Sequence, residues 1–468
     1  MGGFFGVVSK EDCSSDLFYG TDYHSHLGTK RGGLAVWRSD GFVRVIHSIE
    51  NDQFRSRFDN DILAMRAPCG IGVISDTDNQ PLLIRSHLGD YAIVTVGAIK
   101  NKEELVRHAF QTRRLHFSEM SGGEISPTEL VAALINQGES FEAGIRNAQE
   151  AVQGSCSLLL LTSQGIYAAR DELGRTPVVI GRKKDSTAVA LETCSFPNLG
   201  YSTERYLGPG EISFLTAEGY EQRRAPREKM QICGFLWVYY GYPASSYEGI
   251  NVEWVRNRCG TFLARRNPIQ IDFVAGIPDS GIGHGLGYAA EAGVPFKRPF
   301  VKYTPTWARS FMPQSQPLRD LVARMKLIPI RELIAGKRFL FCEDSIVRGT
   351  QLKDTIQRLY DVGALEVHMR PACPPLVYAC KFLNFSVSRS EWDLAARRAI
   401  RELEGENVGD LSRYAKHWTP AYAAMEEKIR SRLSLTTLKY QRLEDLVEAI
   451  GLPKRRVCTY CWDGEEQA

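Results

Sequence analysis

Three short, almost uninterrupted apolar runs in the second half of the chain constrain its fold more than any other feature. They lie within DFVAGIPDSG (272–281), KRFLFCEDS (337–345) and ALEVHMRPA (364–372). Strands of this composition are typical of a parallel sheet that is covered on both faces. Between the second and third runs, a predicted helix places four apolar side chains on one face: Leu352, Ile356, Leu359 and Tyr360. The sequence therefore predicts a strand–helix–strand unit with parallel strands.

The chain has 468 residues, which is too many for one ordinary hydrophobic core and indicates two domains. Its 58 basic and 55 acidic side chains leave a net charge of +3, which excludes a strongly basic nucleic-acid-binding surface. No apolar run approaches the roughly 20 residues that span a bilayer, and the first residues do not resemble a secretory signal. We therefore expect a cytoplasmic protein that binds neither nucleic acid nor a membrane.

A polar, basic stretch, EQRRAPREKMQ at 221–231, separates two apolar-rich halves and is predicted to be a linker. We expect one domain over 1–228 and a second over 229–468. In the first domain, short apolar runs alternate with turn residues and with a helical pattern at 128–138. This rhythm predicts β-sheets flanked by helices.

The second predicted strand ends in two adjacent acids, Glu343 and Asp344, and a short turn then leads into the predicted helix. Backbone N–H groups of the turn, the helix N-terminus and the hydroxyls of Ser345 and Thr350 together form an anion cradle. Two carboxylates beside a phosphate need other partners, and sugar hydroxyls or Mg²⁺ are suitable ones. The stretch therefore predicts a site for a ribose 5-phosphate, with Asp344 at a solvent-facing strand end.

The string DSIVRGT at 344–350 resembles the phosphoribosyl pyrophosphate loop of type I phosphoribosyltransferases, and most specifically that of the amidophosphoribosyltransferase family of purine biosynthesis. The loop at 277–281 is similar to the family's pyrophosphate loop. The resemblance implies Mg²⁺ held by Ser280, Glu343 and Asp344, although the family usually has Asp at position 343. It implies that the substrate is bound by Asp279, Ser280, Gly281, Glu343, Asp344, Ser345, Ile346, Val347, Arg348, Gly349 and Thr350.

The segment at 302–327 resembles the family's flexible loop, because Arg309, Phe311, Arg319 and Lys326 keep its spacing. The resemblance implies that Arg309 and Lys326 act in catalysis together with Asp344. Cations on a closing loop would stabilise the charge that builds on departing pyrophosphate. Ordinary surface charges are the alternative for Arg309 and Lys326.

Three stretches of the first half, at 169–182, 192–196 and 208–212, resemble the family's N-terminal domain. The resemblance implies a four-layer αββα sandwich of the N-terminal-nucleophile hydrolase type, followed by a type I phosphoribosyltransferase domain with a parallel sheet. In the family, the first domain releases ammonia from glutamine.

Four positions depart from this glutaminase pattern. Gly2 stands where the family has its cysteine nucleophile, and Val96 stands where it has the oxyanion-hole asparagine. Ser75 and Pro127 replace an arginine and an aspartate that hold the glutamine. We therefore expect a first domain without glutaminase activity. A misalignment is the alternative, and it has more weight at Ser75 and Pro127 than at Gly2.

The chain ends with a Cys-x-x-Cys motif, Cys458 and Cys461, which alone predicts a metal half-site, a redox pair or unpaired thiols. Cys233 and Cys380 fall where one branch of the family has two further cluster ligands. The resemblance implies that Cys233, Cys380, Cys458 and Cys461 hold a [4Fe–4S] cluster. Structural Zn²⁺ is the alternative, because four thiolates suit either metal.

Together these features predict a transferase that makes 5-phosphoribosylamine from phosphoribosyl pyrophosphate and ammonia, rather than glutamine. We also expect purine nucleotides as effectors and an assembly of identical chains. The alternative is a non-catalytic sensor of phosphoribosyl pyrophosphate or nucleotides that regulates a purine-pathway partner. Cations at positions 309 and 326 favour the enzyme, since a sensor need not stabilise a leaving group.

Overall fold

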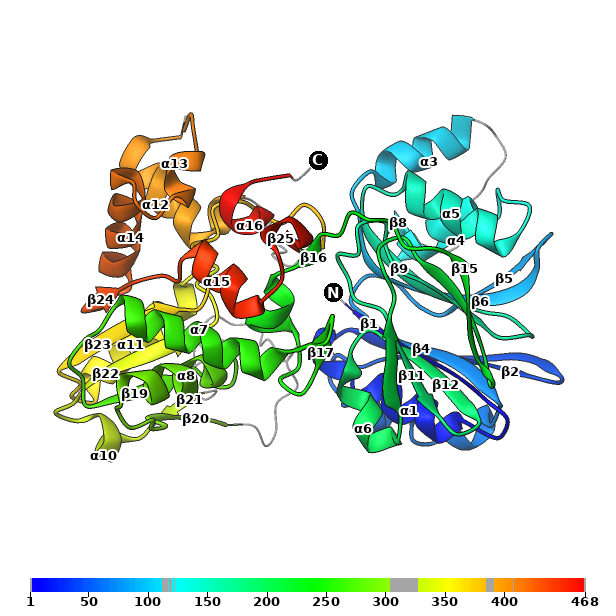
Figure 1. Ribbon diagram of the computed structural model, residues 1–468, viewed down its shortest axis with the longest axis horizontal. Helices are drawn as coiled ribbons and strands as arrows, with labels where there is room; N and C mark the ends of the chain where they lie inside the picture. The colour runs from blue at the N-terminus through cyan, green and yellow to red at the C-terminus, as the bar shows by residue number, and fades with distance from the viewer. Residues whose placement is uncertain are drawn as a thin grey trace.

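The computed structural model describes the whole chain except residues 1, 112–116, 118–119, 122, 304–326, 384–390, 407 and 467–468. Figure 1 shows the first half of the chain as a body of stacked β-sheets, with the second half beside it as a sheet covered by helices. Within the described ranges, no helix is long and apolar enough to cross a membrane.

Two antiparallel sheets form the first half. The first contains, in spatial order, β13 (Ser202–Tyr206), β11 (Val179–Lys183), β12 (Ser186–Ala190), β1 (Gly3–Ser9), β4 (Cys69–Ser75), β2 (Arg31–Arg38) and β3 (Gly41–Ser48). The second contains β15 (Gly219–Arg224), β14 (Ile212–Thr216), β10 (Ile166–Ala169), β9 (Gly154–Leu161), β6 (Gly89–Ile99) and β5 (Leu82–Ser86).

Both faces of the inner strands are buried, which explains their continuous apolar composition. In β1, Phe4 packs between the two sheets, whereas Phe5 packs against the helices outside the first sheet. These outer helices are α1 (Ser14–Asp22), α2 (Phe54–Phe58) and α6 (Phe196–Leu199). The second sheet is covered by α4 (Pro127–Ile135) and α5 (Phe141–Ala151), with α3 (Lys102–Gln111) beside α4. The expected αββα sandwich is therefore confirmed.

The second half is built on a parallel sheet in the order β19 (Phe273–Gly276), β22 (Arg338–Glu343), β23 (Glu366–Pro371) and β24 (Thr437–Leu438). One face is covered by α7 (Val252–Arg266) and α8 (Ile282–Ala292). The other is covered by α11 (Thr350–Asp361), α12 (Ala395–Glu404) and α14 (Pro420–Arg432). The phosphoribosyltransferase-type domain is confirmed, and so is the predicted strand–helix–strand unit.

In that unit, Ile356 and Leu359 of α11 are fully buried against the sheet. The helix ends just before Gly363, whose φ of +102° is a conformation that glycine adopts readily. The apolar spacing and the glycine thus predicted both the buried face and the end of this helix.

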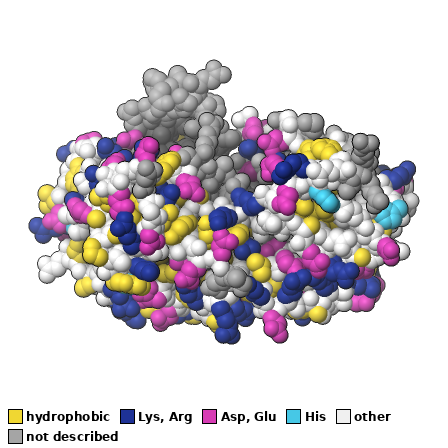
Figure 2. Space-filling view, turned by 90° about the horizontal axis from the view of Figure 1, so that it is seen from above, with side chains coloured by type: hydrophobic (Ala, Val, Ile, Leu, Met, Phe, Trp, Pro, Cys, Tyr) yellow, Lys and Arg dark blue, Asp and Glu magenta, His cyan; other side chains and the backbone are white. Residues whose placement is uncertain are grey.

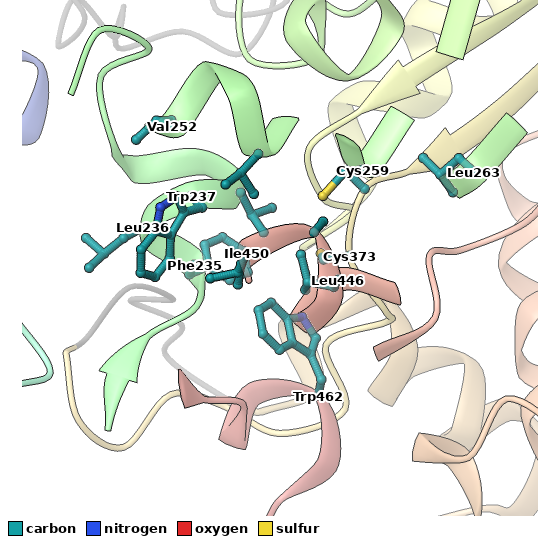
Figure 3. Close-up of a cluster of buried hydrophobic side chains, with 14 of the residues drawn as sticks. Phe235, Leu236, Trp237, Val252, Cys259, Leu263, Cys373, Leu446, Ile450 and Trp462 are labelled. Atoms are coloured by element: carbon teal, nitrogen blue, oxygen red, sulfur yellow. The ribbon is translucent and has the colours of Figure 1, made fainter. Parts of the chain in front are cut away.

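The end of the chain returns to the start of the second half. Strand β25 (Val457–Cys458) pairs in parallel with β16 (Ile232–Cys233), and α16 (Tyr460–Asp463) follows it. Trp462 stacks on Phe235 with ring centroids 5.7 Å apart. Figure 3 shows both rings in the cluster of buried side chains that also contains Leu446 and Ile450 of α15 (Leu443–Ile450).

The predicted linker is only partly correct. Residues 221–224 belong to β15, which pairs with β14 at the edge of the second sheet. The chain leaves the sheet only after Arg224 and reaches β16 at Ile232. An edge strand with charged, exposed side chains has the composition of a linker, so composition alone did not separate the two.

Charged side chains are mixed over the surface. Figure 2 shows basic and acidic groups interspersed on the face seen from above, without a large field of one sign. This distribution agrees with the small net charge of +3.

Candidate active site

Two loops leave the carboxyl ends of neighbouring parallel strands and lie side by side. Gly276 of β19 pairs with Cys342 of β22, and the Ile277 N–H donates to the Cys342 carbonyl at 3.0 Å. A Cβ atom at Gly281 would lie 2.2 Å from the same carbonyl oxygen, so only glycine allows the first loop this close to β22. This is the edge at which open parallel sheets bind ligands.

The acidic pair at the end of β22 is buried. Ser280 Oγ donates to Glu343 Oε1 at 3.4 Å, and the Asp344 N–H donates to the same oxygen at 3.1 Å. Burial and the charge of Asp344 raise the pKa of Glu343 well above its usual range. The expectation of a solvent-facing Asp344 is wrong, because the side chain is only 5% exposed.

The side chains of Ser280, Glu343 and Asp344 offer only oxygen donors, and the two neighbouring carboxylates repel each other. Ser280, Glu343 and Asp344 therefore fit a hard divalent cation such as Mg²⁺, which prefers oxygen ligands and would relieve the repulsion. Among the described residues, no three His, Cys, Asp or Glu side chains are arranged to hold a metal ion. A cation here would depend on two carboxylates, a hydroxyl and its substrate.

The turn between β22 and α11 lies at the N-terminus of α11, where the sequence predicts an anion cradle. Gly349 precedes α11 with φ +71°, a left-handed conformation that favours glycine. Ile346 is buried, and the Val347 carbonyl accepts the Ala395 N–H of α12 at 2.7 Å. The exposed Arg348 also offers its carbonyl to Arg398 of α12. Helix α12 thus holds the backbone of the turn in place through two hydrogen bonds.

Asp279 is exposed at the tip of the first loop and accepts a hydrogen bond from Lys302 Nζ at 2.7 Å. Lys302 ends β20 (Phe300–Lys302), which pairs with β21 (Leu327–Pro329). These two strands bracket the segment with Arg309, Phe311, Arg319 and Lys326, which lies outside the described residues. The contact from Lys302 places the base of that segment beside the first loop.

Arg256 of α7 is a charged neighbour of the site that the sequence did not reveal. Its buried guanidinium donates to the carbonyls of Trp237, Tyr239 and Gly241. Burial lowers the pKa of Arg256, and the charge of Asp344 opposes this more than any other group. No local motif marks this arginine, because its carbonyl partners at 237–241 and the charge of Asp344 come from other segments of the chain.

A cavity of about 890 Å³ lies in the first half of the chain. The four positions at which the sequence departs from the glutaminase pattern all line this cavity: Gly2, Ser75, Val96 and Pro127. Leu383 of the second half also contributes to its wall. The four positions that the resemblance singled out in the sequence thus lie around one cavity in the fold.

Three of these positions are held within the first half of the chain. Ser75 Oγ accepts hydrogen bonds from Thr77 N–H, Asp78 N–H and Gln80 Nε2 at 3.2–3.4 Å. Pro127 occupies the first turn of α4, where a missing N–H is tolerated, and Val96 is buried. The Ser75 hydroxyl is therefore engaged within the protein rather than directed at a ligand.

The four cysteines named above line one small cavity, with Phe382, Trp462 and Arg175 beside them. Cys233 and Cys458 are direct partners in the β16–β25 ladder. A hydrogen bond with Cys380, together with burial, raises the pKa of Cys461. Arg175 of the first half lies over the Phe382 ring at 3.6 Å from its centroid. The cavity thus joins the tail, the start of the second half and the first half.

Comparisons with known proteins give matches over nearly the whole chain. Residues 67–197 match the model of the glutamine amidotransferase domain. The amidophosphoribosyltransferase of Mycobacterium tuberculosis is 30% identical over 478 residues, covering 99% of this chain and 85% of that protein. That of Methanocaldococcus jannaschii is 29% identical, covering 99% of this chain and 97% of that protein.

Among solved structures, glutamine phosphoribosylpyrophosphate amidotransferase from B. subtilis, complexed with ADP and GMP, superimposes with a TM-score of 0.85. It is 27% identical, and the match covers 99% of this chain and 96% of that one. The likeness therefore extends over both domains, the candidate phosphoribosyl site and the cavity of the first half. The chain belongs to the amidophosphoribosyltransferase family, whose enzymes are phosphoribosyltransferases of purine biosynthesis.

Proposed function

We propose that the protein forms 5-phosphoribosylamine from phosphoribosyl pyrophosphate and uses ammonia rather than glutamine as the nitrogen donor. The observation that carries this proposal is a contrast within one chain. Two loops lie side by side at the ends of β19 and β22 with acids and hydroxyls that suit a phosphoribosyl substrate, whereas Gly2, Ser75, Val96 and Pro127 at the cavity of the first half supply no thiol, cation, amide donor or carboxylate.

In this proposal, the backbone N–H groups and hydroxyls of Ser345 to Thr350 bind the 5-phosphate at the N-terminus of α11. Glu343 and Asp344 orient the ribose hydroxyls, and Asp279, Ser280 and Gly281 face the pyrophosphate. Mg²⁺ held by Ser280, Glu343 and Asp344 would neutralise charge on the leaving group. Arg309 and Lys326 are assigned the same task from the segment between β20 and β21.

The proposed loss of glutaminase activity rests on chemistry and on space. Gly2 offers no thiol, and a Cβ atom there would lie 2.3 Å from the Ile74 carbonyl oxygen. At Val96 no side-chain donor remains for an oxyanion, and losing one such donor alone costs on the order of 10²–10³ in rate. Ser75 and Pro127 cannot replace the charged groups that would hold glutamine.

We further propose that the two domains divide near residues 228 and 229, within the extended segment between β15 and β16. The four cysteines are proposed to hold a [4Fe–4S] cluster, since sulfur is the donor at all four positions and they line one small cavity; their side chains are not arranged as a metal site in this structure and would converge on loading. We also propose that purine nucleotides act as effectors, since the B. subtilis protein is complexed with ADP and GMP.

The proposal is tested by incubating the full-length protein with phosphoribosyl pyrophosphate, Mg²⁺ and ammonium, and by measuring pyrophosphate release. Release that depends on both ammonium and Mg²⁺ is the expected result. Saturable binding of phosphoribosyl pyrophosphate without any release would instead support the sensor function.

A further inference from the structure

A short hairpin of the second half docks onto the first half of the chain. Its strands are β17 (Ser246–Tyr247) and β18 (Ile250–Asn251), and residues 245–251 are called the docking hairpin here. The Ser246 N–H donates to Thr193 Oγ1 of the first half at 2.8 Å. The hairpin ends where α7 begins, so its position determines where α7 starts.

The first anchor of the docking hairpin is a buried carboxylate. Glu192 of the first half is only 1% exposed and accepts hydrogen bonds from the Tyr247 hydroxyl and from Ser245 Oγ, the latter at 3.1 Å. His26 Nε2 lies 3.0 Å from Glu192 Oε2. Burial alone would raise the pKa of Glu192, but His26, the charge of His24 and the hydrogen bond from Tyr247 lower it to about 2. Glu192 is therefore a fixed negative charge.

The second anchor has the opposite polarity. Arg170 of the first half is completely buried and donates to Glu248 of the hairpin at 2.8 Å. The rest of its guanidinium is held by three backbone carbonyls of the first half, those of Gly174, Thr176 and Leu207. A buried ion pair is strongly orienting, because separating its partners leaves an uncompensated charge. The two anchors hold adjacent hairpin residues, Tyr247 and Glu248.

On its other side, the hairpin is attached to the core of the second half. Trp237 Nε1 donates to the Ile250 carbonyl at 3.1 Å, and the Trp237 and Tyr247 rings meet edge-on at 5.6 Å. Asn251 caps α7 by accepting the Trp254 N–H at 3.0 Å. Figure 3 shows Trp237 and Val252, the first residue of α7, in the same buried cluster.

From α7, two connections reach the phosphoribosyl site. Arg256 lies one turn into the helix, and its charge interacts with Asp344. Its carbonyl lies 3.2 Å from Nδ1 of the fully buried His284, which belongs to α8. Helix α8 begins directly after Ser280 and Gly281 of the first loop. Asp344 at the end of β22 and the loop that precedes α8 are therefore both linked to α7, the helix whose start the docking hairpin fixes.

We propose that the first domain serves as a positioning element for the phosphoribosyl site, and that it acts through the docking hairpin. Glu192, Arg170 and Tyr247 are positioning residues, since none of them lies at the proposed substrate. Only the expected effect on enzyme kinetics rests on the proposed function; the effect on the structure of the site does not. It also explains why a domain without glutaminase chemistry remains tied to the second half by two buried anchors.

The test compares two deletions of a single hydroxyl in the full-length protein. Tyr247→Phe removes the hydroxyl that donates to Glu192. The control, Tyr91→Phe, removes an equally buried hydroxyl on β6 of the second sheet, which donates to Asn136 and takes no part in the hairpin contacts. Tyr247→Phe is expected to raise KM for phosphoribosyl pyrophosphate about tenfold with a smaller change in kcat, as for the loss of a hydrogen bond to a charged group. Tyr91→Phe is expected to leave both constants unchanged. Glu192→Gln, which still accepts from Tyr247, is expected to fall between them.

Hydrogen exchange without substrate separates this inference from the proposed function. Faster exchange over 277–285 and 343–350 in Tyr247→Phe, but not in Tyr91→Phe, supports the positioning role even in a protein without turnover. Unchanged exchange in these segments, or equal kinetic losses in the two variants, overturns it. A protein that shows the exchange effect but releases no pyrophosphate would refute only the proposed function.

Discussion

The Cβ position of Gly2 lies 2.3 Å from the carbonyl oxygen of Ile74, a distance that no side chain at residue 2 can tolerate. Gly2 belongs to the wall of the cavity in the first half, and Ile74 lies on the neighbouring strand β4. A nucleophile at this position would need the backbone of β1 and β4 to separate. The proposed absence of a nucleophile at residue 2 thus goes with a backbone arrangement that has no room for a side chain there.

Gly2→Cys is accordingly expected not to create a glutaminase. The new side chain must displace the β4 backbone, and Val96 still provides no oxyanion donor, a loss on the order of 10²–10³ in rate by itself. The measurement is glutamate formation from glutamine, with intact-mass detection of thiol alkylation by diazo-oxo-norleucine. Glutamate formation by this variant at the rate of pyrophosphate release would show that the thiol is all that the cavity lacks.

Asp344→Asn is expected to lower ammonium-dependent turnover on the order of 10²-fold, because it removes a charge placed where positive character develops on the ribose. The fold should survive, since asparagine has the same size and can still accept from Ser345. The same substitution also removes the charge that raises the pKa of Glu343, so that pKa should fall. Pyrophosphate release and thermal unfolding are measured side by side.

Asp354→Asn provides the matched control, because Asp354 is exposed on α11 of the same unit. It should leave turnover within about twofold, as is usual for surface substitutions. Equal turnover in the wild type and Asp344→Asn would remove Asp344 from the proposed ribose and Mg²⁺ site.

Stability should depend on the protonation of His24. Burial lowers the pKa of this histidine from 6.5 to about 4. At pH values between these two, the histidine is therefore protonated in the unfolded chain and neutral in the folded one. The free energy of unfolding should therefore fall as pH decreases from about 6.5 to about 4, by roughly 3 kcal/mol from this group. Denaturant unfolding at several pH values should show a shallower decline in His24→Gln. Identical pH profiles for the two proteins would contradict the assignment.

The parts of the fold that the sequence predicted share a local origin. The spacing of Ile356 and Leu359 and the position of Gly363 determined a helix and its end within one short segment. The turn before α11 was predictable for the same reason, since Gly349 and its neighbours are consecutive.

The parts that were missed depend on contacts between distant segments. Asp344 is buried and interacts with Arg256, about ninety positions earlier in the chain, so its surroundings were not visible from the strand end alone. Glu192 and Tyr247 likewise meet only because two domains dock. Residues 221–224 were misread because an edge strand and a linker have the same polar composition.

The cysteine cavity gives a prediction that does not depend on activity. Protein purified without oxygen should be brown and contain about four iron atoms per chain, as for a cubane cluster with four cysteine ligands. Cys461→Ser should lose the colour and most of the iron, whereas Cys156→Ser, outside this cavity, should keep both. Stoichiometric zinc without iron would establish a structural zinc site, and absence of both metals would leave four thiols.

The nitrogen donor is the sharpest point at which this chain should differ from a glutamine-dependent enzyme. Ammonia attacks as the free base, whose fraction of total ammonium grows with pH. Pyrophosphate release at fixed total ammonium should therefore rise from neutral to mildly alkaline pH. Glutamine should give neither glutamate nor pyrophosphate release, with or without Mg²⁺, because Gly2 supplies no thiol and Ser75 no cationic anchor.

Diazo-oxo-norleucine should leave the ammonium-dependent rate unchanged, since the phosphoribosyl site as described contains no reactive thiol: Cys342, nearest in sequence to its acids, is fully buried, and burial raises its pKa. A rate that falls with this reagent, together with glutamate formed in step with pyrophosphate, would mean that glutamine is hydrolysed after all. A flat pH profile would point instead to a step after nitrogen attack, because only the attacking free base carries the expected pH dependence. The combined measurements thus separate the choice of nitrogen donor from the transferase chemistry itself.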